Sequence, residues 1–240
     1  MDGNFIFEME NFIPKELCDD IIQRFENEPR KEQSVLGDGN GIVIDLERKN
    51  SMHIYMNEMK DCTQIENEIY SKLNDALNVY KREFCNYFKR YNENPEFINH
   101  TLFSHRPFEI GDFDVQRVTP KSHQRWHSDE DTNYAHTCII YLNDLDNRDG
   151  GATEFACGRK VQPKAGKLLL FPGGWSNVHR GCFVHKHKYM ITIVTRFVRS
   201  PRYPFIVSPH IQKHHYIHPN HESQRKKDSQ NSTLVKVLES

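Results

Sequence analysis

The spacing of hydrophobic positions changes near residue 100, from a helical period to short strand-like runs. Upstream, apolar residues in a segment that begins at Pro14 share one helical face, and proline suits the first turn of a helix. A second helical pattern extends from Thr63 to Tyr91, with apolar residues near 3.6-residue spacing. Downstream, the pattern predicts β-rich runs at residues 114–118, 135–142, 167–171 and 189–198.

Turn-forming segments separate these runs, and such regular punctuation is typical of a β-sandwich or jelly roll. The most prominent turns are residues 147–151 (NRDGG) and residues 172–174 (PGG). Two further short strands are predicted at residues 4–8 and 52–56. The glycine-rich residues 36–44 are predicted to form a loop.

We expect three successive parts in the chain. Residues 1–100 supply an N-terminal strand and supporting helices that are integral to the fold, and residues 101–207 form the β-rich core. Within the first part, the glycines and charges of residues 28–50 would suit a mobile substrate loop. Residues 208–240 are polar and His-rich, with a histidine cluster at 210–221, and their low apolar content predicts partial flexibility.

Composition is that of an ordinary soluble globular chain, with 37% hydrophobic and 27% charged residues. No apolar run approaches the roughly 18 residues that span a bilayer, and the N-terminus lacks the layout of a signal peptide. Six scattered cysteines without a CxxC pair argue against a cysteine-based zinc site. We therefore expect an intracellular, cytoplasmic protein with no membrane partner.

Charge is unevenly distributed, although the net charge is only −1. Residues 155–221 contain eleven Lys or Arg and no acidic residue, whereas the first 154 residues carry 17 basic and 30 acidic residues, a net charge of −13. The two halves can fold together and neutralise each other, or the basic part can meet an anionic partner. The first reading is the simpler one, so nucleic acid is not an expected partner.

A candidate metal site begins with His127 and Asp129. In an extended segment, residues i and i+2 point to the same side, so this imidazole and this carboxylate can converge on one ion. The pair alone proves little, because the composition predicts about two HxD or HxE matches by chance. A site with two histidines and one carboxylate needs a third ligand from elsewhere in the fold, and His179 lies 50 residues after Asp129.

Lys188 adds a second candidate function to the same region. It stands at the start of the apolar run 189–194, where an ammonium group is costly unless it has a partner. A dicarboxylate cosubstrate would supply that partner.

From about residue 113 to residue 198, the sequence resembles the prolyl 4-hydroxylase-like branch of the Fe(II)/2-oxoglutarate-dependent dioxygenase superfamily. The matching stretches follow the order and the spacing of that family, and the N-terminal helices resemble its helical support more loosely. These stretches are 126–129 (WHSD), 141–144 (YLND), 150–155 (GGATEF), 161–171 (VQPKAGKLLLF), 179–182 (HRGC) and 188–192 (KYMIT).

The resemblance implies a mainly β fold with helical support, a double-stranded β-helix (jelly roll) whose N-terminal α-helices pack on the major sheet. It implies Fe(II) as the metal cofactor, with His127, Asp129 and His179 as the metal ligands and the catalytic centre. It also implies 2-oxoglutarate and O2 as cosubstrates, with ascorbate as a reductant. The resemblance is to enzymes, and the retained carboxylate of Asp129 favours hydroxylation over halogenation.

Three residues match cosubstrate-binding positions of the family. Lys188 matches the residue that binds the distal carboxylate of 2-oxoglutarate, and Thr137 matches a position that faces the cosubstrate. Thr192 is a further candidate near the same strand face. One position departs from the pattern, because Val118 stands where the family commonly has a tyrosine that contacts the cosubstrate, and valine donates no hydrogen bond.

The resemblance favours a peptidyl prolyl residue as the hydroxylated group, and so a peptide or protein as the partner. A free amino acid or another small molecule remains open, because loops set the choice of substrate. A nucleic-acid demethylase on the same scaffold and a non-catalytic binding module are the remaining alternatives. A steep salt dependence of nucleic-acid binding would favour the demethylase.

Overall fold

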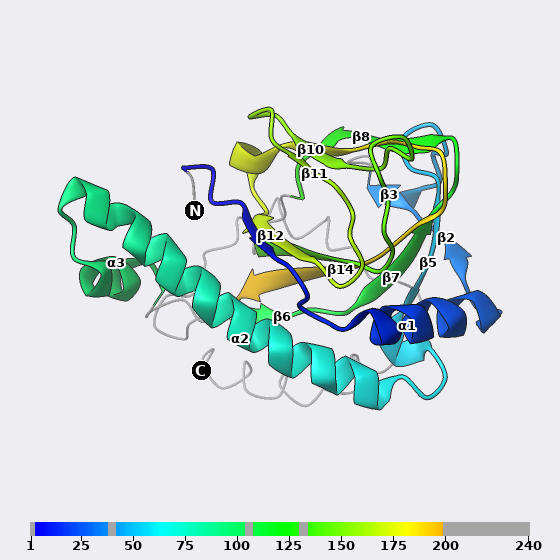
Figure 1. Cartoon of the computed structure of the whole chain (residues 1–240), viewed down its shortest axis with the longest axis horizontal. Helices are drawn as coiled ribbons and strands as arrows, with labels where there is room; N and C mark the ends of the chain where they lie inside the picture. Colours follow the sequence, from blue (N-terminus) through cyan, green and yellow to red (C-terminus); the bar gives the residue numbers. More distant parts are fainter. Residues whose placement is uncertain (1–2, 38–41, 104–107, 130–133, 199–240) are drawn as a thin grey trace, which may run out of the picture. The chain divides into compact units, whose positions relative to one another are not determined.

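Two antiparallel β-sheets form the centre of the computed structural model, which describes residues 3–37, 42–103, 108–129 and 134–198 (Figure 1). The larger sheet follows the strand order β1-β12-β9-β14-β7-β5-β2, and β6 pairs with β14. Its strands are β1 (Phe7–Met9), β2 (Glu32–Gln33), β5 (Ser51–Tyr55), β6 (Phe108–Ile110), β7 (Asp114–Val118), β9 (Tyr134–Tyr141), β12 (Leu168–Pro172) and β14 (Lys188–Phe197).

The smaller sheet lies above the larger one in Figure 1 and follows the order β11-β10-β13-β8. Its strands are β8 (Ser122–His127), β10 (Thr153–Phe155), β11 (Lys160–Val161) and β13 (His179–Val184). A separate two-stranded ribbon pairs β3 (Leu36–Gly37) with β4 (Ile42–Val43). The described helices are α1 (Lys15–Asn27), α2 (Thr63–Tyr87), α3 (Pro95–Leu102) and the short 3-10 segments η1 (Met56–Glu58), η2 (Phe88–Tyr91) and η3 (Trp175–Asn177).

Helix α1 begins where the sequence predicts, directly after Pro14. Pro14 has an extended backbone at the N-cap. Glu16 lies in the first turn, where a negative charge interacts favourably with the helix dipole. The buried side of the helix carries Cys18, Ile21 and Phe25. These apolar groups have the spacing of one helical face, so burial of that face against the larger sheet accounts for the position of the helix.

Helix α2 is the long helix that the spacing predicts between Thr63 and Tyr91. It remains α-helical to Tyr87 and then tightens into the 3-10 segment η2. Its buried residues are Ile65, Ile69, Leu73, Ala76, Leu77, Tyr80 and Cys85. Both α1 and α2 lie on the side of the larger sheet that faces away from the smaller sheet (Figure 1).

Alternation along the central strands divides the core into two layers. In β14, Ile191 and Ile193 pack with the helices, whereas Met190 belongs to a second cluster between the two sheets. In β9, Cys138 and Ile140 likewise face the helices, whereas Ile139 and Tyr141 belong to the second cluster. Since alternate strand residues point to opposite faces, one face of the larger sheet holds the helices and the other lines the space between the sheets.

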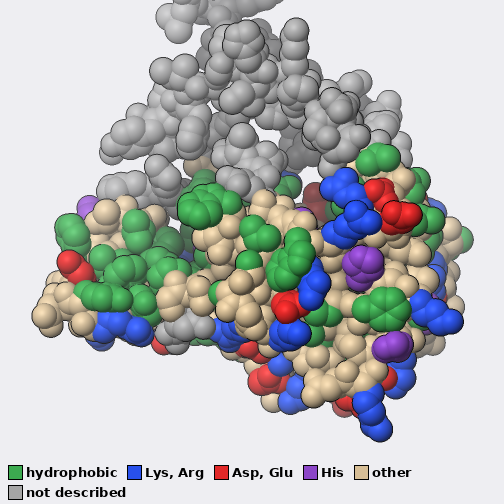
Figure 2. All heavy atoms as spheres, turned by 90° about the horizontal axis from the view of Figure 1, so that it is seen from above, with side chains coloured by type: hydrophobic (Ala, Val, Ile, Leu, Met, Phe, Trp, Pro, Cys, Tyr) green, Lys and Arg blue, Asp and Glu red, His purple; other side chains and the backbone are tan. Residues whose placement is uncertain are grey.

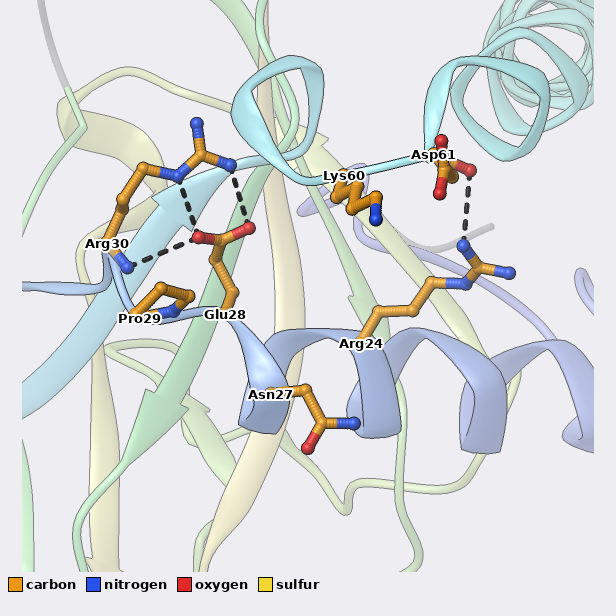
Figure 3. A pocket seen from close by; sticks show the side chains of 7 residues that line it. All are labelled: Arg24, Asn27, Glu28, Pro29, Arg30, Lys60 and Asp61. Carbon is orange, nitrogen blue, oxygen red and sulfur yellow. Dashed lines mark hydrogen bonds and ion pairs between the residues drawn. The ribbon is translucent and has the colours of Figure 1, made fainter.

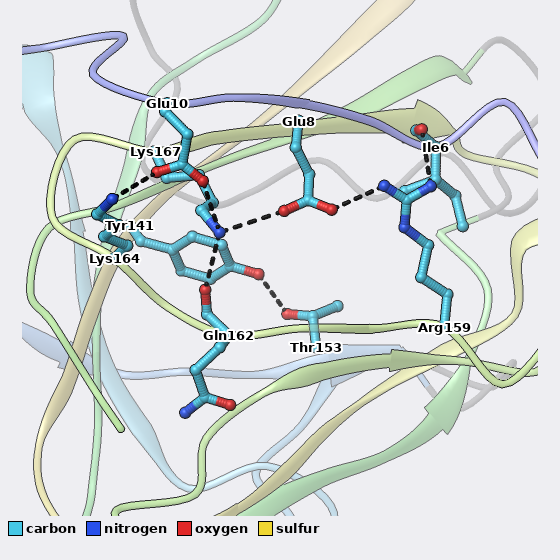
Figure 4. A network of polar contacts seen from close by, with 9 residues as sticks. All are labelled: Ile6, Glu8, Glu10, Tyr141, Thr153, Arg159, Gln162, Lys164 and Lys167. Carbon is cyan, nitrogen blue, oxygen red and sulfur yellow. Dashed lines mark hydrogen bonds and ion pairs between the residues drawn. The ribbon is translucent and has the colours of Figure 1, made fainter. Parts of the chain in front are cut away.

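Residues 7–10 of the N-terminal segment are held against the larger sheet by hydrogen bonds and ion pairs (Figure 4). The Lys167 ammonium lies 3.2 Å from a Glu8 oxygen and 3.0 Å from a Glu10 oxygen, and Arg159 lies 2.7 Å from the other Glu8 oxygen. The amide of Phe12 donates to the Gly166 carbonyl at 2.7 Å. A side chain at Gly166 would meet the Ile13 carbonyl at 2.1 Å, so this close approach requires glycine.

Ion pairs between distant parts of the chain account for much of the uneven charge distribution. Basic residues of the acid-free stretch pair with acids from the first 154 residues, and Figure 2 shows Lys and Arg side chains interspersed with Asp and Glu on one face. The described pairs are Arg159–Glu8, Lys160–Glu154, Lys164–Glu10, Lys167–Glu8, Lys167–Glu10, Arg180–Glu154 and Lys186–Asp149. In the described part of the chain, these pairs neutralise part of the charge difference between the two halves.

Predicted and observed elements differ in a few places. The prediction of a loop at residues 36–44 is partly wrong, because β3 and β4 form two-residue strands within it. Such strands are too short to produce a hydrophobic period. The prediction did not include β8 (SHQRWH), because its six residues are polar apart from Trp126.

None of the helices in residues 3–37, 42–103, 108–129 and 134–198 combines the length and the apolarity that a membrane crossing requires. The histidine cluster predicted at 210–221 and the C-terminal part from residue 208 lie outside the described residues.

Candidate metal centre and cosubstrate pocket

The three predicted metal ligands converge at one end of the smaller sheet. Strand β8 ends at His127 and β13 begins at His179, and these two residues are direct cross-strand partners. Asp129 follows β8 by two residues. One potential ligand atom from each residue lies within 4.8 Å of the others, so the three side chains can hold a single ion.

Backbone carbonyls orient both imidazole rings. His127 Nδ1 lies 2.7 Å from the Arg125 carbonyl oxygen, and His179 Nδ1 lies 3.1 Å from the Asn177 carbonyl oxygen. Because a carbonyl oxygen only accepts, each Nδ1 carries the hydrogen and each Nε2 presents a lone pair. The Nε2 atoms lie 3.5 Å and 3.6 Å from the Asp129 oxygens. This donor set fits a divalent transition metal, and such second contacts fix the ring orientation in metal sites.

Two further side chains contact the candidate ligands. The Thr137 hydroxyl donates to Asp129 Oδ2 at 2.7 Å, so Thr137 orients the carboxylate. The Gln124 amide lies 3.0 Å from His127 Nε2, and a metal on that lone pair would replace this hydrogen bond. Burial lowers the pKa of His179, which keeps its imidazole neutral and able to bind a metal.

Lys188 lies at the start of β14 on the inner face of the larger sheet. It is 4% exposed, and burial lowers its pKa to about 8. Among the described residues, no carboxylate forms an ion pair with its ammonium group, which lies 5.2 Å from the centre of the Tyr141 ring. A buried cation without a counterion favours an anionic ligand at this position.

Tyr141 is a neighbour of Lys188 that the sequence analysis did not single out. Its side chain is fully buried, and its hydroxyl donates to Thr153 Oγ1 at 2.7 Å. The YLND stretch that carries the family resemblance begins at this residue, so the resemblance was the signal that could have identified it.

Val118 is the direct cross-strand partner of Lys188, as the missing tyrosine of the family would be. It packs in the cluster between the two sheets and offers no hydrogen bond. The adjacent Arg117 does not replace the tyrosine, because it pairs with Glu26 at 2.8 Å on the helical side of the sheet. As predicted from the sequence, the position beside Lys188 therefore carries no hydrogen-bond donor in its side chain.

Thr192 shares the inner face of β14 with Lys188 but lies four residues away. At ~3.3 Å per strand residue, this separation is roughly 13 Å. Thr192 is the cross-strand partner of Asp114 in β7 and of Ile139 in β9. Its position is therefore closer to Asp114 than to the Lys188 ammonium group.

A pocket of about 440 Å³ lies elsewhere, at the C-terminal end of α1 (Figure 3). The Glu28 carboxylate accepts two hydrogen bonds from the Arg30 guanidinium, at 2.7 Å and 2.8 Å, and this pairing lowers the pKa of Glu28 to about 2. Arg30 also donates to the Glu58 carbonyl, and Lys31 donates to the Glu28 carbonyl at 2.6 Å. These groups satisfy one another's hydrogen bonds and charges, so the ion pairs around this pocket have a structural role.

Comparisons with known proteins agree with this geometry. Residues 113–196 match the family model described as the 2OG-Fe(II) oxygenase superfamily. A search of curated protein sequences finds no match.

Solved structures with a similar fold include prolyl hydroxylases. The viral collagen prolyl hydroxylase of Paramecium Bursaria Chlorella virus-1, in its 2OG complex, has 19% identity and a TM-score of 0.54, covering 82% of this chain and 98% of its own. A Pseudomonas putida prolyl-4-hydroxylase has 16% identity and a TM-score of 0.58, covering 82% and 95%. A Trichoplax adhaerens prolyl hydroxylase, in complex with a hypoxia inducible factor oxygen degradation domain peptide fragment, has 14% identity and a TM-score of 0.61, covering 81% and 84%.

These findings confirm the double-stranded β-helix and the resemblance to prolyl hydroxylase-like 2OG oxygenases. Residues 113–196 are similar to the 2OG-Fe(II) oxygenase superfamily, and this match supports a dioxygenase that uses Fe(II), 2-oxoglutarate and O2.

Proposed function

We propose that this protein is an Fe(II)- and 2-oxoglutarate-dependent dioxygenase that hydroxylates an unactivated C–H bond of a peptidyl prolyl residue. The observation that carries the proposal is the convergence of His127, Asp129 and His179, whose ligand atoms lie within 4.8 Å of one another. Two imidazoles and one carboxylate that leave open positions are the ligand set of non-haem Fe(II) oxygenases.

Iron bound to this triad would supply the oxidation, in which one oxygen atom of O2 enters the substrate C–H bond and the other converts 2-oxoglutarate to succinate and CO2. The residues of this chain orient the reactants. Lys188 binds the distal carboxylate of 2-oxoglutarate, and the adjacent Tyr141 ring forms the wall beside it. Thr137 holds the Asp129 carboxylate in place. Thr192 contributes to the same inner face as Lys188.

The peptidyl prolyl substrate rests on similarity in fold to prolyl hydroxylases, one of which was solved with a peptide fragment. Ascorbate as a reductant and a cytoplasmic location belong to the same proposal and rest on the sequence. A free amino acid or small-molecule substrate is the second candidate, because buried and partly buried polar groups on β5 and β7 face the space between the sheets. The ion pairs of the acid-free stretch disfavour a nucleic-acid demethylase, and the complete triad disfavours a non-catalytic module.

An anaerobic titration tests the proposal directly. Addition of Fe(II) and 2-oxoglutarate should produce a metal-to-ligand charge-transfer band, and admission of air should yield succinate. A protein that forms no band and no succinate would not be a dioxygenase of this class. Mass spectrometry of a proline-containing peptide array and of free proline then identifies which substrate gains one oxygen atom.

A further inference from the structure

A polar row on β5 and β7 lies on the inner face of the larger sheet and has no role in the chemistry described above. Its centre is Asp114, whose carboxylate oxygens accept from His53 Nδ1 at 2.8 Å and from Gln116 Nε2 at 2.5 Å. The strand register places His53 opposite Gln116 and Tyr55 opposite Asp114, so all four side chains share one face. Thr192 of β14 lies on the other side of Asp114.

Gln116 presents a buried acceptor without a donor. The residue is 3% exposed, and its Oε1 atom has no hydrogen-bond partner among the described residues. Rotation of the Gln116 amide would not give Oε1 a partner at Asp114, because the Asp114 carboxylate only accepts hydrogen bonds and therefore requires Nε2 on its side. A buried acceptor is costly when it is unpaired, so the site favours a ligand that brings an N–H or O–H group.

Lys49 adds a cation to the same region. Its backbone forms an antiparallel bridge with Gln124, and residues that pair directly point to the same side of a sheet. Because the Gln124 side chain reaches His127 Nε2 at 3.0 Å, the Lys49 side chain also faces the candidate metal centre. The residue as a whole is partly exposed, but burial of the ammonium group lowers the pKa of Lys49.

The charges around Lys49 are carboxylates of the site itself. Asp114 and Asp129 are its electrostatic neighbours, yet no carboxylate of the described residues lies within ion-pair distance of its ammonium group. Asp129 belongs to the metal triad, and both Asp114 oxygens are already occupied by His53 and Gln116. Lys49 therefore has carboxylates of both the candidate metal centre and the polar row as electrostatic neighbours, with no direct counterion in the described part of the chain.

We propose that Lys49 and Gln116 recognise the substrate that is hydroxylated, with Lys49 binding a carboxylate of that substrate and Gln116 Oε1 accepting from its N–H or O–H group. His53 and Asp114 act as positioning residues that fix the Gln116 amide. The inference rests on the proposed function and narrows its substrate class to a carboxylate-bearing compound. The carboxylate can belong to an acidic residue next to the target proline in a peptide, or to a free amino acid.

Matched pairs of probes separate these two sources. The first pair is a set of proline-containing peptides with Glu beside the proline and the same peptides with Gln. The second pair is L-proline and L-prolinamide. Each probe is titrated anaerobically into the Fe(II)–2-oxoglutarate complex, and the shift of the charge-transfer band gives its Kd without turnover. In one of the two pairs, wild-type protein should bind the acid at least about tenfold more tightly than the amide, as expected for one charge-assisted contact. The pair that shows this preference identifies the source of the carboxylate.

Variants then assign the preference to particular residues. Lys49→Met should reduce the acid-to-amide ratio to about one while the Fe(II)–2-oxoglutarate band is retained. The matched control is Lys72→Met, which removes a partly exposed lysine of α2 and should leave the ratio unchanged. Gln116→Met should raise the KM of both members of a pair by a similar factor with little change in kcat, because it removes an acceptor and not a charge.

The outcomes distinguish the inference from the proposed function. A wild-type complex that forms the band but binds no acid probe more tightly than its amide partner overturns the inference alone, and this comparison needs no variant. A preference that persists in Lys49→Met also overturns it. Absence of the band in wild-type protein overturns the proposed function, and the inference falls with it.

Discussion

The two sheets differ in how far their polar groups are satisfied before any ligand binds. In the smaller sheet, His127 and His179 are cross-strand partners, and backbone carbonyls hold their rings at 2.7 Å and 3.1 Å. In the larger sheet, the described residues leave Lys188 without an ion pair and Gln116 Oε1 without a donor. The smaller sheet therefore preorganises the two histidines of the candidate metal centre, whereas the larger sheet carries groups that only a ligand can satisfy.

This contrast has a physical cause in the chemistry of the two kinds of ligand. A metal requires a few lone pairs in a fixed geometry, and for the two histidines strand pairing and backbone hydrogen bonds supply that geometry. A cosubstrate carboxylate brings its own charge, so its receptor must remain a buried and uncompensated cation. Four perturbations, in order of expected effect, test whether the two sheets act in this way.

His179→Ala removes a ligand from the smaller sheet and should have the largest effect. We expect loss of the charge-transfer band and of succinate formation to below detection, because two ligands remain in a site built for three. The matched control is His185→Ala, which removes an exposed histidine after the same strand. Loss of the band in the control as well would assign the metal to a different histidine set.

Lys188→Met removes the cation of the larger sheet and should spare the metal. We expect the Kd for 2-oxoglutarate to rise by about 30-fold or more, because truncating one partner of a buried charge pair costs roughly 2–5 kcal/mol. Fe(II) binding should change little. Lys186→Met is the control, since it removes an exposed lysine that pairs with Asp149 at 2.8 Å. An unchanged 2-oxoglutarate requirement in Lys188→Met would contradict the cosubstrate assignment.

Binding of 2-oxoglutarate should weaken at alkaline pH. Burial lowers the pKa of Lys188 to about 8 in the free protein, so the charged form that binds a carboxylate is lost as pH rises through this value. Affinity should be level below that pH and fall by up to about tenfold for each unit above it. Anaerobic titrations across this range measure the effect, and Lys188→Met should abolish this part of the pH dependence.

Val118→Tyr should have the smallest effect and the opposite sign. The new hydroxyl would lie beside Lys188, where the family has its tyrosine, and one hydrogen bond contributes roughly 0.5–1.5 kcal/mol. We expect the Kd for 2-oxoglutarate to fall by about two- to tenfold. Val118→Phe supplies the ring without the hydroxyl. Equal effects of the two substitutions would show that filling space, and not hydrogen bonding, changes the affinity.

Much of the fold could be predicted because the spacing of apolar residues shows which face of a helix or strand is buried. Strand β7 has the predicted bounds, α1 begins after Pro14 as predicted, and β9 and β14 differ from their predictions by one residue at each end. Each of these elements buries a regular apolar face. Strand β8 does not, because one of its ends carries a histidine of the candidate metal centre and the other contacts a loop.

The candidate site was predictable to a different degree in its two parts. Convergence of His127, Asp129 and His179 was predicted because the HxD spacing and the family order restrict where the third ligand lies. The polar row was not predicted. Its assembly depends on the register between β5 and β7, which sets His53 opposite Gln116, and register is a property of the folded sheet rather than of either segment.

The pairing of β1 with β12 also bears on the solubility of the protein. Strand β12 lies at the edge of the larger sheet once β1 is removed, and its residues Leu168, Leu169 and Leu170 are fully buried. A chain shortened past Glu10 would expose an apolar edge able to pair with another molecule, and would deprive Lys167 of both its carboxylates. Strand β1 and Glu10 therefore cover an edge that would otherwise favour aggregation, although neither belongs to the candidate site.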